Sequence, residues 1–243
     1  MKAVVIIPAR YASTRLPGKA LAAIAGRPLV QHVYERAMRA RGIERVVVAT
    51  DDERIRAAVA AFGGEAVMTA TAHRTGTDRV AEAAEALDAD VVVNVQGDEP
   101  LIPPAVVEQV AAALGPDEPA PMASAMTRVR SPEERDSPSV VKVVVDCHGY
   151  ALYFSRHPIP FVRESGQEHV PYKHLGIYAY RKEYLRRFAR LPATPLERLE
   201  MLEQLRALEH GHRIRMVESD YDPVSVDTPE DLARVRALIE SGR

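Results

Sequence analysis

Cysteine is almost absent from the 243-residue sequence, because Cys147 is the only one. A single cysteine excludes a disulfide within the chain and a cysteine-rich zinc site. A surplus of positive charge is missing as well, since the formal net charge is -2 at pH 7. Proteins that bind nucleic acid non-specifically usually carry a basic surplus, so we expect no nucleic-acid partner. Any site for an anionic ligand must therefore gather its positive charge locally.

Long apolar runs are also missing. No stretch approaches the ~20 consecutive apolar residues that a membrane-spanning helix needs, so we expect no membrane partner. The apolar run at the N-terminus is short and is followed directly by Arg10, which is typical of a first strand and not of a signal peptide. The sequence has no repeats and no low-complexity tract. We expect a cytoplasmic protein with a single domain over residues 1–243.

Short β-branched runs alternate with Ala-rich amphipathic segments in the first part of the chain. The predicted strands are Ala3–Ile7, Arg45–Ala49 and Ala89–Val95. The predicted helices are Leu29–Ala40, Glu53–Phe62 and Thr77–Leu87. This alternation predicts a three-layer α/β/α sandwich with a mostly parallel sheet. Ligands bind such sheets at the carboxyl ends of the strands, which is where candidate site residues are expected.

The pattern changes between about residues 140 and 185. Strands are predicted over Val140–Val145, Ala151–Ser155 and Leu175–Tyr180, without helices between them. We expect a smaller, antiparallel, strand-rich insertion here, which forms a ligand-binding or dimer surface. Beyond it the predicted elements are a helix over Leu196–His210 that ends at Gly211, a strand over Ile214–Val217 and a helix from Pro229.

A basic loop follows the first predicted strand. It contains Arg10, Arg15 and Lys19, which could surround a triphosphate with bidentate guanidinium donors and a compact ammonium. The loop is not a P-loop, because Ser13 stands where the first glycine is required and Ala20 replaces the metal-binding Ser or Thr. A solvated loop is the alternative. The position at the ligand edge of the sheet favours a phosphate site.

Two aspartates stand at positions where a carboxylate can meet a ligand. Asp98 follows a predicted buried strand through a glycine, although an aspartate of this kind can also serve a turn or a helix cap. Asp227 precedes Thr228, a good N-cap, followed by Pro229 at the first helical position and Asp231 at the third. The start of the last helix is therefore provided for without Asp227, which is available for another role.

Motifs that resemble one family recur in order along nearly the whole chain. They begin with PARYASTRLPGKAL from Pro8, HRTGTDR from His73 and NVQGDEPLI from Asn94. The later ones are VVKVV (140–144), ALYFSR (151–156), YKHLGIYAYR (172–181), LEQLR (202–206) and VDTPEDL (226–232). Together they resemble the bacterial cytidylyltransferases of 3-deoxy-D-manno-octulosonate (Kdo), the CMP-Kdo synthetases. Thr75 stands where this family usually has Ser, which keeps the hydroxyl group.

The resemblance implies a nucleotide-diphospho-sugar transferase-like fold and a reaction in which CMP passes from CTP to the anomeric hydroxyl of Kdo. Pyrophosphate leaves, and CMP-Kdo serves lipopolysaccharide biosynthesis. The resemblance places Asp98 and Asp227 on Mg²⁺, an ion that prefers hard oxygen ligands. Lys19 and Arg10 complete the expected catalytic group. A homodimer is expected from the resemblance and from the strand-rich middle of the chain.

The expected substrate contacts divide into two groups. Thr75 can also be the N-cap of the following helix, and one residue can serve both roles. Glu200 and Gln204 are spaced i,i+4, so a single helix would place them on one face, although that face can also be merely solvated. The residues expected to contact the nucleotide are Pro8, Ala9, Arg10, Arg15, Lys19, Thr75, Arg79 and Gln96. Those expected to contact the sugar are Gln96, Arg156, His174, Glu200 and Gln204.

Two other functions compete with this interpretation. One is a cytidylyltransferase for another acidic sugar, such as a sialic acid or an amino analogue of Kdo, because the nucleotide half would look much alike. The other is a non-catalytic nucleotide-binding relative on the same fold. The joint presence of Asp98, Asp227 and Lys19 argues against the second, since an idle relative has no need of both metal carboxylates.

Overall fold

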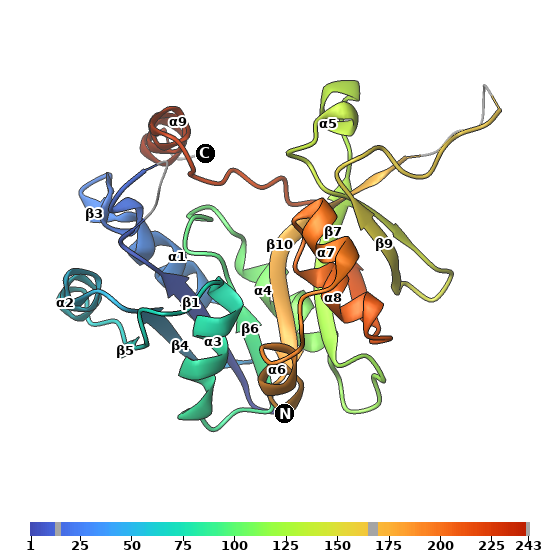
Figure 1. The fold of residues 1–243 in the computed structure, drawn as a ribbon. Coiled ribbons are helices and arrows are strands. Elements are labelled where there is room, and N and C mark those ends of the chain that lie inside the picture. The colour runs from blue at the N-terminus through green and yellow to red at the C-terminus, as the bar shows by residue number, and fades with distance from the viewer. Residues whose placement is uncertain (13–15, 165–169, 242–243) are drawn as a thin grey trace.

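The computed structural model describes residues 1–12, 16–164 and 170–241. Its centre is a nine-stranded sheet in which seven strands follow the order β11-β7-β10-β6-β1-β4-β5, while β8 and β9 extend it from β10 (Figure 1). The strands are β1 Ala3–Ala9, β4 Ile43–Thr50, β5 Ala66–Met68, β6 Val91–Asn94, β7 Met122–Arg128, β8 Lys142–Val145, β9 Ala151–Ser155, β10 Tyr172–Arg181 and β11 Ile214–Glu218. A separate small hairpin joins β2 Ala23–Ile24 to β3 Arg27–Pro28.

The helices lie on both sides of this sheet. The longer ones are α1 Leu29–Met38, α2 Glu53–Ala61, α3 Gly76–Glu85, α4 Pro104–Ala112 and α9 Pro229–Glu240. The shorter ones are η1 Lys19–Leu21, α5 Pro132–Asp136, α6 Lys182–Phe188, α7 Pro195–Glu200 and α8 Gln204–Glu209. The alternation of side chains along β1 separates two cores: Val5 and Ile7 pack with α1, α4 and α9, whereas Val4 and Ile6 pack with α3, α6 and α8. The predicted three-layer sandwich is confirmed.

Strand direction in the sheet is mostly parallel, as the sequence predicts. β1 pairs in parallel with β4 and β6, β4 with β5, and β7 with β11. Along the path of seven strands the exception is β10, which lies antiparallel between β6 and β7. Because β1, β4 and β6 run the same way, their carboxyl ends share one edge of the sheet, and the loops that follow them meet there.

The strand-rich middle of the chain is divided differently from the prediction. β8 and β9 form an antiparallel pair that stands beside the main sheet, but β10 lies inside that sheet. The interval of about 140–185 therefore combines a peripheral strand pair with a central strand of the sheet. The pairing of β10 with β7 shifts register between Leu175 and Tyr178, around Gly176. Irregular pairing of this kind re-aims side chains and is frequent beside active sites.

The single helix predicted over Leu196–His210 is wrong. The chain forms α7 and α8 separately, because Met201 adopts the left-handed conformation with φ 52° and ψ 47°. A left-handed residue ends an α-helix, so Glu200 and Gln204 belong to different helices and do not share one helix face. Gly211 follows α8 with φ 75°, as expected for a residue just beyond a helix end.

A long connection from β11 to α9 crosses the molecule (Figure 1). It is fixed where the Tyr221 hydroxyl donates to Glu99 Oε2 at 2.9 Å and where the Val226 N–H donates to the Asp98 carbonyl at 2.9 Å. The predicted helix start is confirmed, since Thr228 and Asp231 form a capping box with Pro229 in the first turn. This connection carries Asp227 to the loop that follows β6.

Candidate active site

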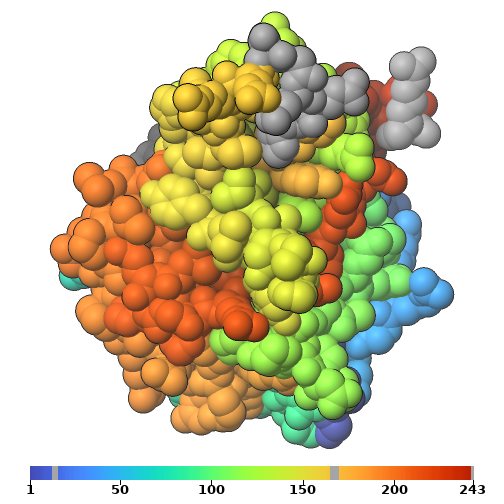
Figure 2. Space-filling view, turned by 90° about the vertical axis from the view of Figure 1, so that its right-hand side faces the viewer, coloured from blue at the N-terminus to red at the C-terminus, as the bar shows by residue number. Residues whose placement is uncertain are grey.

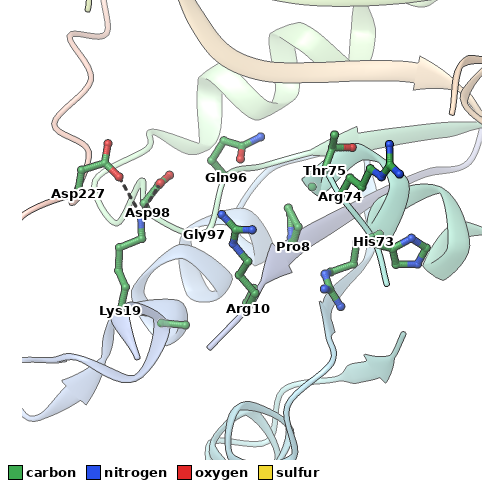
Figure 3. A pocket seen from close by; sticks show the side chains of 14 residues that line it. Pro8, Arg10, Lys19, His73, Arg74, Thr75, Gln96, Gly97, Asp98 and Asp227 are labelled. Carbon is green, nitrogen blue, oxygen red and sulfur yellow. Dashed lines mark hydrogen bonds and ion pairs between the residues drawn. The ribbon is translucent and has the colours of Figure 1, made fainter. Parts of the chain in front are cut away.

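A cavity of about 390 Å³ lies at the edge of the sheet where β1 and β6 end (Figure 3). In Figure 3, Lys19, Asp98 and Asp227 stand at one end of it and His73, Arg74 and Thr75 at the other. Its lining residues are Pro8, Ala9, Arg10, Lys19, Ala20, His73, Arg74, Thr75, Gly76, Arg79, Gln96, Gly97, Asp98 and Asp227. The structure therefore brings together all the predicted catalytic and nucleotide-binding residues that it describes. Arg15 lies outside the described residues.

The acidic end of the cavity is built from two distant parts of the chain. Lys19 Nζ donates to Asp98 Oδ2 at 2.8 Å and to Asp227 Oδ1 at 3.0 Å. Burial disfavours the ammonium, but the charges and hydrogen bonds of both carboxylates outweigh it and raise the pKa of Lys19. Lys19 therefore stays protonated and neutralises part of the charge that the two aspartates concentrate here.

The two aspartates fit a divalent cation with oxygen ligands. Their carboxylates converge on a single cation in the structure, the Lys19 ammonium. No cluster of three or more His, Cys, Asp or Glu side chains suited to a metal occurs among residues 1–12, 16–164 and 170–241. Mg²⁺ is typically held by one or two carboxylates and completed by water and substrate phosphates. Asp98 and Asp227 supply that donor set.

The loops after β1 and β6 touch through their backbones. A Cβ atom added at Gly97 would lie 2.9 Å from the Pro8 carbonyl oxygen, closer than real Cβ contacts allow. Glycine is therefore required at this position, and the close approach places Asp98 directly beside the loop that carries Arg10. Arg10 lines the cavity and points toward its middle (Figure 3).

The opposite end of the cavity is the N-terminus of α3. Thr75 is its N-cap and forms a capping box with Asp78, so the predicted capping role is confirmed, while the same residue lines the cavity. The exposed N–H groups and the dipole at the start of a helix favour negative or electron-rich ligand groups. One threonine thus faces both the helix and the ligand space.

Arg79 is buried at this end of the cavity, with 4% of its surface exposed. Its guanidinium donates to Asp51 Oδ2 at 2.7 Å and to Thr69 Oγ1 at 2.5 Å. The partner Asp51 was not expected from the sequence, where only its neighbour Asp52 has a recognisable role as the N-cap of α2. Asp51 stands immediately after β4, at the same sheet edge, and this position is the sequence feature that could have identified it.

A second cavity, of about 620 Å³, adjoins the first and shares Gly76 and Gln96 with it. Predicted sugar residues Gln96, His174 and Gln204 line it. Its other lining residues are Gly76, Thr77, Asn94, Glu134, Ser139, Val140, Val141, Lys173, Gly176, Tyr178, Met201, Leu202, Glu203, Asp222, Pro223, Val224, Ser225 and Arg234.

Three buried polar atoms on the wall of this second cavity have no hydrogen-bond partner among the described residues. They are Asn94 Nδ2, Glu203 Oε1 and Gln204 Nε2. Buried polar groups in folded proteins are almost always paired, and one left unpaired costs about 1–3 kcal/mol. Two donors and an acceptor are therefore ready for a ligand rich in hydroxyl groups. Asn94 had not been expected here, although it lies within one of the sequence motifs.

His174 is held on the same wall. Its Nε2 lies 2.8 Å from Ser124 Oγ, and its ring packs edge-on against Phe154 with the centroids 5.1 Å apart. Burial lowers the pKa of His174 to about 3, so the imidazole is neutral at physiological pH. It can exchange hydrogen bonds with a sugar but does not offer it a positive charge. Tyr178 Oη donates to Gln204 Oε1 at 3.3 Å and orients that amide.

Arg156 and Glu200 do not line either cavity. The Arg156 guanidinium donates to the carbonyl oxygens of Glu200 at 2.7 Å and of Pro138 at 2.9 Å. The Glu200 carboxylate accepts the backbone N–H of Arg156 at 2.9 Å and the Ser155 hydroxyl at 2.6 Å. The two predicted sugar residues therefore join β9 to the end of α7. The interruption at Met201 is the reason that Glu200 lies apart from Gln204.

Comparison with known proteins agrees with this geometry. Residues 4–214 match the model of the cytidylyltransferase family. The 3-deoxy-manno-octulosonate cytidylyltransferase of Geotalea daltonii is 54% identical over 245 residues, which cover 97% of each chain. The protein of the same name from Trichlorobacter lovleyi is 50% identical over 252 residues, covering 100% of each.

Solved structures lead to the same family. A structure of CMP:2-keto-3-deoxy-manno-octonic acid synthetase complexed with CTP has a TM-score of 0.95 and 46% identity, and each chain is covered completely. The 4-diphosphocytidyl-2C-methyl-D-erythritol synthase of Anaerococcus prevotii, 15% identical with a TM-score of 0.62, shares the fold and covers 98% of this chain and 99% of its own. The chain therefore belongs to the cytidylyltransferase family and, within it, to the 3-deoxy-manno-octulosonate cytidylyltransferases.

Proposed function

We propose that the protein transfers CMP from CTP to the anomeric hydroxyl of Kdo, giving CMP-Kdo and pyrophosphate. The observation that carries this proposal is the junction of two unlike cavities at Gln96 and Gly76. One has a cationic loop and two convergent carboxylates, and the other has unpaired polar atoms suited to a polyhydroxy compound. A phosphate compound and a sugar can thus meet beside Asp98.

The order of groups along the first cavity suits CTP. The base would lie toward Thr75 and Arg79, where backbone groups of Pro8 and Ala9 can read its edge. The triphosphate would then reach Arg10 and Lys19 at the other end (Figure 3). Arg15 is assigned to the same phosphates from the sequence alone.

Asp98 and Asp227 would hold Mg²⁺. Bound there, the ion would neutralise charge on the phosphates and polarise the attacking hydroxyl. The Lys19 ammonium contacts both carboxylates, so it would lie beside the phosphates of a triphosphate bound at this end of the cavity. The charges of Arg10 and Lys19 would stabilise pyrophosphate as it departs. No covalent intermediate with the protein is needed, because alignment of the hydroxyl with the α-phosphorus lowers the barrier.

The sugar would occupy the second cavity. Gln96 lies at the junction and can contact both substrates. Asn94 and Gln204 offer donors, and the Glu203 carboxylate offers an acceptor, to the hydroxyls of the sugar. His174 adds a neutral hydrogen-bonding group.

Pyrophosphate release tests the reaction directly. Purified protein with CTP, Mg²⁺ and Kdo is expected to release pyrophosphate and to form CMP-Kdo in equal amounts, measured by a coupled assay and by mass spectrometry. Omission of Kdo is expected to stop release. The amino analogue of Kdo and a sialic acid serve as competitors, and a higher kcat/KM for either one would replace Kdo as the substrate.

A homodimer is proposed from one face of the molecule. Figure 2 shows β9 and the segment after it beside α7 and α8. Large apolar side chains are exposed on these segments, and Phe161 is 89% exposed. The others are Leu152, Val162, Leu199 and Met201. Large apolar side chains exposed on neighbouring segments are typical of interaction sites, and a second copy would cover them. Light scattering of the Phe161→Asp variant is expected to show a smaller particle than the parent protein.

The proposed product would feed lipopolysaccharide assembly, and the proposed place of reaction is the cytoplasm, where CTP is made. In the part of the chain that the structure describes, no helix is long and apolar enough to cross a membrane. Cell fractionation tests the location: recovery with the membrane fraction after a high-salt wash would contradict it.

A further inference from the structure

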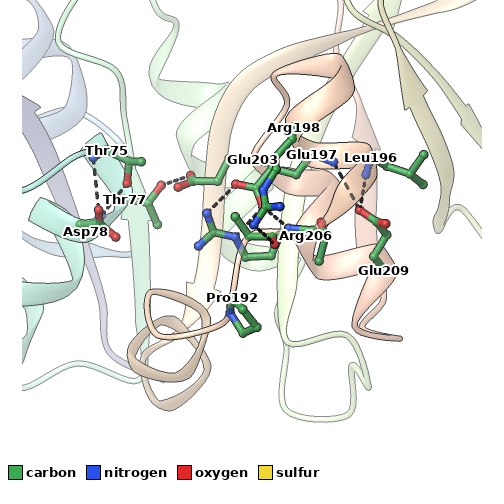
Figure 4. A network of polar contacts seen from close by, with 12 residues as sticks. Thr75, Thr77, Asp78, Pro192, Leu196, Glu197, Arg198, Glu203, Arg206 and Glu209 are labelled. Atoms are coloured by element: carbon green, nitrogen blue, oxygen red, sulfur yellow. Dashed lines mark hydrogen bonds and ion pairs between the residues drawn. The ribbon is translucent and has the colours of Figure 1, made fainter.

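One hydrogen bond joins the first turn of α3 to a carboxylate on the wall of the second cavity. The Thr77 hydroxyl, in the first turn of α3, donates to Glu203 Oε2 (Figure 4). Thr77 is 4% exposed and lines only the second cavity, whereas Thr75, two residues earlier, lines the first. The first turn of α3 therefore touches the nucleotide side with one threonine and a sugar-side carboxylate with the next.

The Glu203 side chain has few alternatives to this arrangement. Glu203 precedes α8, which is fastened to α7 by an ion pair between Arg206 Nε and Glu197 Oε2 at 2.8 Å. Both members of this pair are largely buried (Figure 4). With Oε2 held by Thr77, Oε1 lies in the buried wall of the cavity with no hydrogen-bond partner assigned to it among the described residues. Thr77 thus fixes one of the two carboxylate oxygens.

The charges around Glu203 come from both elements packed against it. Burial raises the pKa of Glu203, and Asp78 adds to this, while the hydroxyls of Thr77 and Thr75 and the charge of Arg206 lower it. Two buried phenols, Tyr178 and Tyr180, also lie within the electrostatic reach of Glu203. Loss of the Thr77 hydroxyl is therefore expected to raise the pKa of this carboxyl group further.

We propose that Thr77 is a positioning residue that holds Glu203 for the sugar and couples its orientation to nucleotide binding at the first turn of α3. The proposal rests on the proposed function, because it takes the second cavity as the sugar site. CTP that contacts Thr75 fixes the start of α3, and with it the Thr77 hydroxyl. Glu203 then presents Oε1 in one orientation. By linkage, the sugar strengthens CTP binding by the same factor.

The matched variants are Thr77→Val, which keeps the shape and loses the hydroxyl, and Thr77→Ser, which keeps the hydroxyl. Because the variant loses a hydrogen bond to a charged group, Thr77→Val is expected to raise the KM for Kdo about tenfold or more. The affinity for CTP measured in the absence of Kdo should change less than about twofold, because the coupling between the two ligands does not act there. Thr77→Ser should stay near the parent protein.

Two further measurements separate positioning from a merely structural role. Calorimetry of Kdo binding with and without CTP, Mg²⁺ being omitted to prevent turnover, gives the coupling factor, and Thr77→Val is expected to abolish most of it. The acid limb of kcat/KM for Kdo should move to higher pH in Thr77→Val, because the donor that lowers the Glu203 pKa is gone.

A double-mutant cycle decides whether Thr77 acts through Glu203. In the Glu203→Gln background, Thr77→Val is expected to have little added effect on the KM for Kdo. The proposal is overturned if the effects of the two substitutions add, if Thr77→Ser is as impaired as Thr77→Val, or if Thr77→Val weakens CTP binding in the absence of Kdo as much as it weakens Kdo binding. If Thr77→Val does not fold, Thr77→Ser and Thr77→Cys supply the same comparison with a weaker donor.

The proposed function and the role of Thr77 can be contradicted by different results. Absence of product with Kdo in the unaltered protein would contradict the proposed function. A different pattern would contradict only the role of Thr77. In that pattern the unaltered protein turns over Kdo and Glu203→Gln raises the KM for Kdo, but Thr77→Val changes neither this KM nor the coupling factor.

Discussion

The two cavities of the site are built from different kinds of segment. The nucleotide cavity is formed by short, continuous segments that follow β1 and β6 and begin α3. The sugar cavity takes its residues from the segment before β8, from β10, from the turn between α7 and α8, and from the connection before α9. The first depends on where strands end, which is a local property of the sequence. The second depends on irregularities, such as the register shift in β10 and the left-handed Met201.

The largest expected effect lies at the acidic end of the nucleotide cavity. Asp98→Asn and Asp227→Asn each remove a charge that would hold Mg²⁺, and each is expected to lower kcat by about 100-fold or more. The matched control is Asp220→Asn, since Asp220 is exposed and lines neither cavity. Steady-state kinetics at saturating CTP and Kdo is the measurement. Near-normal turnover in either variant would remove that aspartate from the catalytic group.

The next effect in size is a pH dependence of the unfolding free energy, which His174 in the sugar cavity causes. The folded protein keeps His174 neutral down to pH about 3, whereas the unfolded chain protonates it near pH 6.5. Between these values the unfolded state binds more protons, so stability falls as the pH falls. His174→Gln is expected to reduce the loss of unfolding free energy between pH 7 and 5 by at most about 2 kcal/mol. Urea titrations at both pH values measure it, and an equal loss in parent and variant would contradict the burial of this imidazole.

A smaller effect distinguishes the two cavities by substrate. Gln204 is 3% exposed and its Nε2 has no partner among the described residues, so Gln204→Ala is expected to raise the KM for Kdo about tenfold. The KM for CTP should hardly change. Gln31→Ala, on α1 away from both cavities, is the control. A larger change for CTP than for Kdo would reverse the assignment of the two cavities.

The smallest expected effect concerns backbone geometry in the sugar cavity. Met201 holds a left-handed conformation that a β-branched residue tolerates poorly. Met201→Ile is expected to lower the unfolding free energy by about 1 kcal/mol relative to Met201→Gly and to raise the KM for Kdo. Thermal denaturation of both variants is the measurement. Equal stability would mean that the turn between α7 and α8 can relax without cost.

Sequence patterns predicted the nucleotide half well for a physical reason. Buried parallel strands are continuous apolar runs, and the predicted strand Ala3–Ile7 and helix Glu53–Phe62 differ from β1 and α2 by one or two residues. The residues Asp98 and Lys19 stand directly after such strands or in the loops that follow them. Their meeting with Asp227 could be expected from the motifs, but the distance between these groups could not.

The structure of the sugar half could not be predicted from local sequence patterns. β7 has the sequence MASAMTR, whose small and flexible side chains do not favour a strand, and its position is decided by pairing with β10 and β11. The residues of α7 and α8 have one continuous helical pattern, so the break at Met201 is set by tertiary packing. Glu200 was assigned to the sugar through a helix that does not exist as one piece, whereas Arg156 was assigned to it from the family resemblance.

The connection that delivers Asp227 has a consequence for inactivation. α9 buries only Leu232 and Val235 among its side chains, so its undocking exposes far less apolar surface than opening of the sheet. Because Asp227 immediately precedes this helix, partial unfolding that leaves every central strand paired would still separate it from Asp98. Turnover would then vanish in mild denaturant before spectroscopic signals of the sheet change, and enzymatic activity would report the docking of the last helix.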